Sequence, residues 1–173
     1  MLKDKVAQAL NEQINAEMYS GYLYYSMAYY FEDEGLPGFA KWLRIQAMEE
    51  MTHAQRIAGY VVDRGARVLV KEIAAPPTEW KSPLAVFEQV AEHERHVSDL
   101  INKLVDLARE ERDHATDNFL QWFVAEQVEE EASADEALGK LRRIEGSKHG
   151  LFMLDREFGG RSFEVPADLG GVI

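Results

Sequence analysis

The chain has 173 residues, no cysteine, and 31 acidic against 19 basic side chains, which gives a formal net charge of -12 at pH 7. The lack of cysteine excludes disulfide frameworks, thiolate zinc sites, iron–sulfur clusters and cysteine catalysis. An acidic chain without a run of Lys or Arg is poorly suited to nucleic acid, and no stretch approaches the roughly 18 apolar residues of a membrane span. Because the start also lacks a signal-peptide core, we expect a single-domain cytoplasmic protein.

Glycine and proline divide the chain into four long segments and one short one. We predict one domain over 1–158, with helices over about 5–33, 37–64, 83–111, 114–145 and 147–158, and a flexible tail over 159–173. Pro37 suits a first helical turn, and Ser82 before Pro83 is typical of an N-cap and first helical position. Asp113 is a candidate cap for the fourth helix.

Each long segment has apolar residues at spacings of three and four, the pattern of a helix that packs in a bundle. In each segment a carboxylate interrupts this apolar seam at a position that should face the core. The four interruptions are Glu17, Glu50, Glu94 and Glu130. The pattern therefore predicts an all-α four-helix bundle with four inward glutamates.

The heights of these glutamates agree with two antiparallel hairpins. If the first two helices fold back near residue 35, position 17 lies between Glu50 and His53, and a fold near residue 112 places Glu94 beside Glu130. The 17 residues from 65 to 81 can stretch to about 56 Å. A helix of about 27 residues is only roughly 40 Å long. The second and third helices can therefore run parallel, joined by one long crossover in an up-down-down-up bundle.

Four buried carboxylates beside a single imidazole are unfavourable as bare charges, since each uncompensated buried ion costs several kcal/mol. Two divalent cations would neutralise them, and carboxylate oxygen with imidazole nitrogen suits iron or manganese. Di-iron bundles take a Glu from each of two helices and a Glu-x-x-His pair from each of the other two. This chain has one such pair, Glu50 and His53, and Gln127 with Glu130 where the second would stand.

The remaining histidines do not fit this pattern. His93 and His96 stand at i-1 and i+2 from Glu94, so they point away from its face and are expected at the surface. His114 and His149 lie near predicted helix ends, where we expect them to be solvated.

Four stretches carry a family likeness: Asn15-Ala16-Glu17, Glu49-Glu50-Met51-Thr52-His53-Ala54, Glu92-His93-Glu94, and NFLQWFVAEQVEEE over 118–131. On these residues the chain resembles a non-haem ferritin of the bacterial and archaeal type over essentially its whole length. The resemblance implies a ferritin-like bundle with a short fifth helix near channels of a cage. It also implies iron storage with ferroxidase activity, in which O2 or peroxide oxidises Fe²⁺ and the ferric product is stored as mineral. The cage is expected to be a homo-oligomer of 24 subunits without haem.

The resemblance also implies the site residues. One iron would be held by Glu17, Glu50 and His53, and a second by Glu50, Glu94 and Glu130, with Gln127 close by. A third iron would be held by Glu49, Glu126 and Glu129 with Glu130. Tyr24, two helical turns after Glu17 on the same seam, would stand beside the centre.

Several alternatives stay open. Met51 lies where a haem-binding bacterioferritin has its methionine ligand, but Gln127 and Glu130 depart from that family's second Glu-x-x-His pair. A di-iron oxidase or oxygenase without a storage role fits the ligand types, and a metal-free structural bundle is the last option. A rubrerythrin-like peroxidase needs a cysteine iron site, and a DNA-protecting mini-ferritin often uses basic tails, so neither fits.

Overall fold

The structure, a computed structural model, describes residues 2–163. This part of the chain forms five α-helices: α1 (Asp4–Asp33), α2 (Pro37–Asp63), α3 (Pro83–Glu110), α4 (His114–Arg143) and α5 (Lys148–Phe158). None of these helices combines the length and apolar character needed to cross a bilayer. Residues 164–173 of the predicted tail lie outside the described residues.

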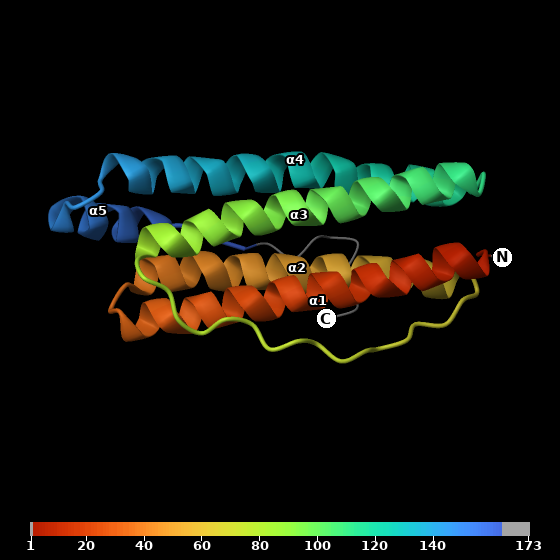
Figure 1. Ribbon diagram of the computed structural model, residues 1–173, viewed down its shortest axis with the longest axis horizontal. Coiled ribbons are helices and arrows are strands. Elements are labelled where there is room, and N and C mark those ends of the chain that lie inside the picture. The colour runs from red at the N-terminus through yellow and green to blue at the C-terminus, as the bar shows by residue number, and fades with distance from the viewer. Residues whose placement is uncertain (1, 164–173) are drawn as a thin grey trace.

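Helices α1 to α4 lie side by side as a bundle (Figure 1). α1 and α2 form one antiparallel hairpin and α3 and α4 form another. The connection over 64–82 has no helix or strand and returns along the length of the bundle to the end where α3 begins. α2 and α3 therefore point the same way, which confirms the predicted all-α up-down-down-up bundle with its long crossover and short fifth helix.

The ends of the helices fall at residues that suit them. The Ser82 hydroxyl accepts a hydrogen bond from Ala85 N, and the Asp113 carboxylate accepts one from Thr116 N, so both predicted N-caps are confirmed. Gly35 follows α1 with φ of 71°, in the left-handed region that glycine enters without steric cost. These local signals fix where each hairpin turns, and so fix which residues of neighbouring helices share a height.

The interior consists of two apolar clusters with a polar layer between them. The cluster nearer α5 includes Phe31, Phe39 and Phe87. The cluster at the other end includes Ile57 and Ile101. Apart from Gly21, the buried residues that separate these clusters on the four long helices are polar or charged, so the layer crosses the middle of the bundle.

α5 is attached firmly to the first turn of α2. The Asp155 carboxylate, buried in the interface, accepts hydrogen bonds from Gly38 N at 2.7 Å and Phe39 N at 3.1 Å. It thereby satisfies backbone donors that the start of a helix leaves free. The Phe158 ring lies 4.9 Å from the Phe39 ring and 6.0 Å from the Trp42 ring, centroid to centroid. The fifth helix is thus an anchored part of the core.

Candidate metal centre

The polar layer gathers the glutamates that the seams predict. Glu17 comes from α1, Glu50 and His53 from α2, Glu94 from α3 and Glu130 from α4. All five side chains are buried, with exposed fractions between 0% and 6%. Carboxylates at this depth are unfavourable unless hydrogen bonds or cations compensate them.

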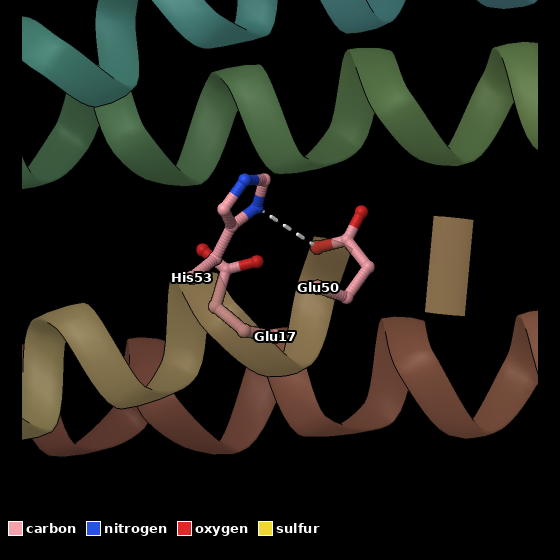
Figure 2. A group of neighbouring side chains, drawn as sticks. All are labelled: Glu17, Glu50 and His53. Carbon is pink, nitrogen blue, oxygen red and sulfur yellow. Dashed lines mark ion pairs between the residues drawn. The ribbon is translucent and has the colours of Figure 1, made fainter. Parts of the chain in front are cut away.

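One compact group is formed by Glu17, Glu50 and His53 (Figure 2). Each of the three offers one ligand atom, and these atoms all lie within 4.8 Å of one another. His53 Nδ1 lies 3.4 Å from Glu50 Oε2, because the two residues are one helical turn apart on α2. The predicted first set of ligands is therefore brought together at one point.

A second group joins His53 to α4. Ligand atoms of His53, Glu126 and Glu130 lie within 4.8 Å of one another, and His53 Nε2 is 3.9 Å from Glu126 Oε1. Among residues 2–163 these are the two groups of three or more that meet this distance, and Glu94 belongs to neither. The carboxylates of the expected second set, Glu50, Glu94 and Glu130, are close enough to act on one another. Their ligand atoms do not all lie within 4.8 Å of one another.

Hydrogen bonds explain the position of the Glu94 carboxylate. Its Oε1 accepts from the Tyr24 hydroxyl and its Oε2 from Gln127 Nε2 at 3.3 Å. Gln127 also donates to the Glu94 backbone oxygen at 3.2 Å. Tyr24 is completely buried, and this burial, followed by the neighbouring carboxylates, raises its pKa well above the ordinary value of 10.0. The phenol therefore stays protonated and serves as a donor.

Two glutamines that we did not predict as site residues hold two more of the glutamates, Glu17 and Glu130. Gln13 Nε2 donates to Glu17 Oε1 at 2.9 Å, and Gln46 Nε2 donates to Glu130 Oε2 at 2.7 Å. A neutral amide orients a carboxylate without cancelling its charge. The signal in the sequence is a glutamine one turn before each seam glutamate of the first hairpin, Gln13 before Glu17 and Gln46 before Glu50.

The donor set of this layer fits divalent cations. Both oxygens of Glu50, and Oε2 of Glu17, are buried without a hydrogen-bond partner among the described residues. Burial raises the pKa of Glu50 well above 4.5, and the Glu94 and Glu17 carboxylates add to the effect. The pKa of Glu94 rises to about 8, again chiefly through burial. Carboxylate oxygens that lack donors, beside one imidazole, suit a divalent cation such as iron or manganese.

The three outer carboxylates of the expected third site are placed differently from one another. Glu126 is half-buried beside His53, and burial is the main cause that raises its pKa. Glu49 is also half-buried, has its pKa raised to about 7 chiefly by burial, and accepts a hydrogen bond from Arg161 at 2.7 Å. Glu129 is exposed on α4. The structure therefore brings Glu126 to the centre and pairs Glu49 with a cation of the chain itself.

Of the histidines outside the centre, His93 does not lie at the surface as expected. His93 is half-buried rather than at the surface, with Nε2 2.8 Å from the Ser20 hydroxyl and its ring against Tyr19 and Tyr24. Burial, together with His96, lowers the pKa of His93 to about 4. The difference arises because Tyr19, Ser20 and Tyr24 of α1 cover His93. The helix pattern of α3 alone would leave this side of the helix exposed to solvent.

Met51 packs within its own chain. A Cβ atom added to Gly21 would lie 3.3 Å from the Met51 sulfur, so this side chain is seated against α1. Met on a helix commonly fills such gaps. The contact supports a packing role for Met51.

Comparison with known proteins gives a consistent result. The ferritin family, described as a ferritin-like domain, matches residues 7–144. A bacterial non-haem ferritin of Bacteroides fragilis is 50% identical over 161 residues, which cover 93% of this chain and 100% of that protein. One from Staphylococcus saprophyticus is 40% identical, covering 95% of this chain and 98% of the relative.

Solved structures agree with these relatives. An open-pore ferritin from the archaeon Archaeoglobus fulgidus superposes with a TM-score of 0.93 at 52% identity, covering 94% of this chain and 100% of that one. A form of that ferritin engineered to be closed gives 0.94 at 51% identity over 95% and 100% of the two chains. The inward carboxylates, the crossover topology and this full-length similarity lead to one conclusion: the chain belongs to the non-haem ferritins of bacteria and archaea.

Proposed function

We propose that this protein stores iron and is itself a ferroxidase, oxidising Fe²⁺ to Fe³⁺ at a dinuclear centre in the polar layer. The observation that carries the proposal is the buried Glu50 carboxylate, which has no hydrogen-bond partner among the described residues and lies beside three further glutamates and His53. Two Fe²⁺ ions supply two electrons, enough to reduce O2 to hydrogen peroxide or hydrogen peroxide to water. Membership of the non-haem ferritins supports storage of the ferric product as mineral.

In this proposal the residues divide into ligands and supports. Glu17, Glu50 and His53 bind the first Fe²⁺, and Glu50 with Glu94 and Glu130 binds the second. Glu50 is proposed as the shared ligand because the Glu94, Glu17 and Glu130 carboxylates all act on it, raising its pKa after burial has done so. Gln127 and Tyr24 are proposed to keep the Glu94 carboxylate in place by donating to both of its oxygens.

The outer carboxylates are proposed to hold a third Fe²⁺. Glu49, Glu126 and Glu129 would act with Glu130, which faces both the inner and the outer group. Support comes from the position of Glu126, whose oxygen lies 3.9 Å from His53, and from its raised pKa, to which Glu130 and Glu129 contribute after burial. A cation between these groups would relieve their mutual repulsion.

We further propose a cytoplasmic homo-oligomeric cage of 24 subunits without haem. Among the described residues, large apolar side chains are exposed on four helices and in the crossover, and exposed apolar surface of this kind is commonly covered by neighbouring subunits in an oligomer. They are Tyr22 and Tyr29 on α1, Val62 on α2, Leu69 and Val70 in the crossover, Val128 on α4, and Phe152 and Met153 on α5. Fe²⁺ and O2 or hydrogen peroxide are the proposed substrates, and neither nucleic acid nor a membrane is a proposed partner.

Stopped-flow oxidation of Fe²⁺ by the assembled protein tests the ferroxidase proposal. Glu50→Gln and His53→Ala should each slow the rapid phase by at least about 100-fold, because loss of even a supporting residue at a metal site commonly costs 10- to 100-fold. Glu92→Gln, an exposed position on α3, is the matched control and should leave the rate unchanged. Gel filtration checks that every variant assembles. A rapid phase that persists in both centre variants would overturn the proposal.

A further inference from the structure

Arg161 connects the chain after α5 to the outer edge of the metal centre. The described chain continues a short way past α5 in the direction of that helix (Figure 1), and Arg161 Nη2 lies 2.7 Å from Glu49 Oε2 on α2. Glu49 is the outer carboxylate that directly precedes Glu50. A permanent positive charge of the protein is thus bound to a group that we propose as a ligand for the third Fe²⁺.

The guanidinium is held in this position from several sides. Its central carbon lies 4.7 Å from the Trp42 ring centroid, a cation–π distance. Two residues earlier, the backbone oxygen of Gly159 accepts from Lys41 Nζ at 2.8 Å, and Asp155 fixes α5 to the start of α2. The side chain of Arg161 is 23% exposed. The position of the Arg161 guanidinium is therefore set by the anchoring of α5 on α2.

The ion pair between Arg161 and Glu49 uses only part of the guanidinium, which favours its replacement by another cation. Arg161 Nη1 is buried and has no hydrogen-bond partner among the described residues. A guanidinium can bind a carboxylate through two parallel hydrogen bonds. Here Arg161 donates one hydrogen bond to Glu49, from Nη2 to Oε2. The contact neutralises Glu49 but does not use the full capacity of the arginine.

We infer that Arg161 is an internal counter-cation that occupies Glu49 while the outer site is empty and is displaced when a third cation binds. The inference rests on the third site proposed above and assigns a regulatory positioning role to Arg161. A guanidinium and a divalent cation repel each other at this range, and both need the same carboxylate. Binding of the third cation therefore frees Arg161, and with it residues 159–163.

The test is a calorimetric titration of the intact, metal-free assembly with Zn²⁺, which binds such ligands without redox chemistry. Arg161→Gln should bind the third ion per chain at least about tenfold more tightly than the wild-type protein, because the competing charge is gone. Arg161→Lys keeps the charge and should stay within about threefold of wild type. Arg156→Gln, which removes an exposed arginine from α5, is the matched control and should change nothing.

The sign of the change separates competition from simple support. If Arg161 only oriented Glu49 for the metal, Arg161→Gln would weaken the third ion, and that result overturns the inference. Unchanged affinity for the third ion, with two ions still bound tightly in the centre, also overturns it while leaving the ferroxidase proposal intact. Failure of the first two ions to bind would instead contradict the proposed function.

Hydrogen exchange gives a second measurement. In wild-type protein, amides over 155–163 should exchange faster when three Zn²⁺ are bound per chain than when two are bound. In Glu49→Gln, which removes the shared carboxylate charge, the rate should no longer depend on the third equivalent of Zn²⁺. Equal protection of 155–163 at two and three equivalents in the wild-type protein would count against displacement of Arg161.

Discussion

Glu50 differs from the other three glutamates of the layer in its hydrogen bonds. The other three accept hydrogen bonds from neutral donors. Glu17 accepts from Gln13 and Glu130 from Gln46. Glu94 accepts from Tyr24 and Gln127. Within residues 2–163 neither oxygen of Glu50 has such a partner. Three carboxylates are therefore oriented by neutral donors before any cation arrives, whereas the polar neighbour of Glu50 is the His53 ring, whose Nδ1 lies 3.4 Å from Glu50 Oε2.

The raised pKa of Glu94 predicts how stability depends on pH without metal. Its pKa is about 8 in the folded chain against an ordinary 4.5, so between these values the folded state binds more protons than the unfolded state. The stability that this group contributes is then fully present below about pH 4.5 and is lost as pH rises toward 8.

Chemical unfolding of the metal-free protein from pH 5 to 8 checks this expectation. Glu94→Gln should flatten the decline, because its amide does not titrate. Zn²⁺-loaded protein should show a smaller decline as well, since bound cations replace the protons. Parallel pH profiles for Glu94→Gln and wild type would show that Glu94 is not the source.

At this scale the sequence predicts the carboxylates better than their partners. A glutamate on an apolar seam is visible because it breaks a pattern, as Glu17 and Glu94 do. Gln13 and Gln46 break the pattern less, and which carboxylate each amide reaches depends on rotamers and on the depth of the neighbouring helix. Arg161 gives no periodic signal, because its contact depends on how α5 is anchored.

Among the elements, the helices were the most predictable part. Spacings of three and four, the caps at Ser82 and Asp113, and a glycine at the first hairpin turn are local signals that tertiary packing leaves intact. The covering of His93 by Ser20 was not predictable in the same way. It depends on the rotation of α1 against α3, which no local pattern determines.

The anchoring of α5 gives a prediction for one glycine of α2. A Cβ at Gly38 would lie 1.7 Å from the backbone oxygen of Asp155, so Gly38→Ala must push α5 away. Amides of α5 should then exchange hydrogen at least about tenfold faster while α3 stays protected. Gly59→Ala on the same helix meets nothing within 4 Å, and should be neutral or slightly stabilising. Unchanged protection of α5 in Gly38→Ala would refute this role of the contact.

For the molecule as a whole, the net charge of -12 bears on how iron reaches the centre. Acidic surfaces concentrate divalent cations by electrostatic focusing, and salt screens this attraction. The initial rate of Fe²⁺ uptake should therefore fall several-fold as ionic strength rises from about 20 to about 200 mM. Oxidation of Fe²⁺ already bound, followed in a single turnover, is the internal control and should hardly change. Uptake that is insensitive to salt would contradict electrostatic attraction.

The two-hairpin topology has a consequence for the order of assembly. Glu17 and Glu50 belong to the first hairpin, Glu94 and Glu130 to the second, so much of the repulsion between carboxylates opposes the docking of one hairpin on the other. Each hairpin forms from contacts close in sequence, whereas docking must close the long crossover loop. A cation that binds the docked state alone stabilises that last step by mass action. In the proposed function, iron would then be both the cargo of the protein and a ligand that completes its folding.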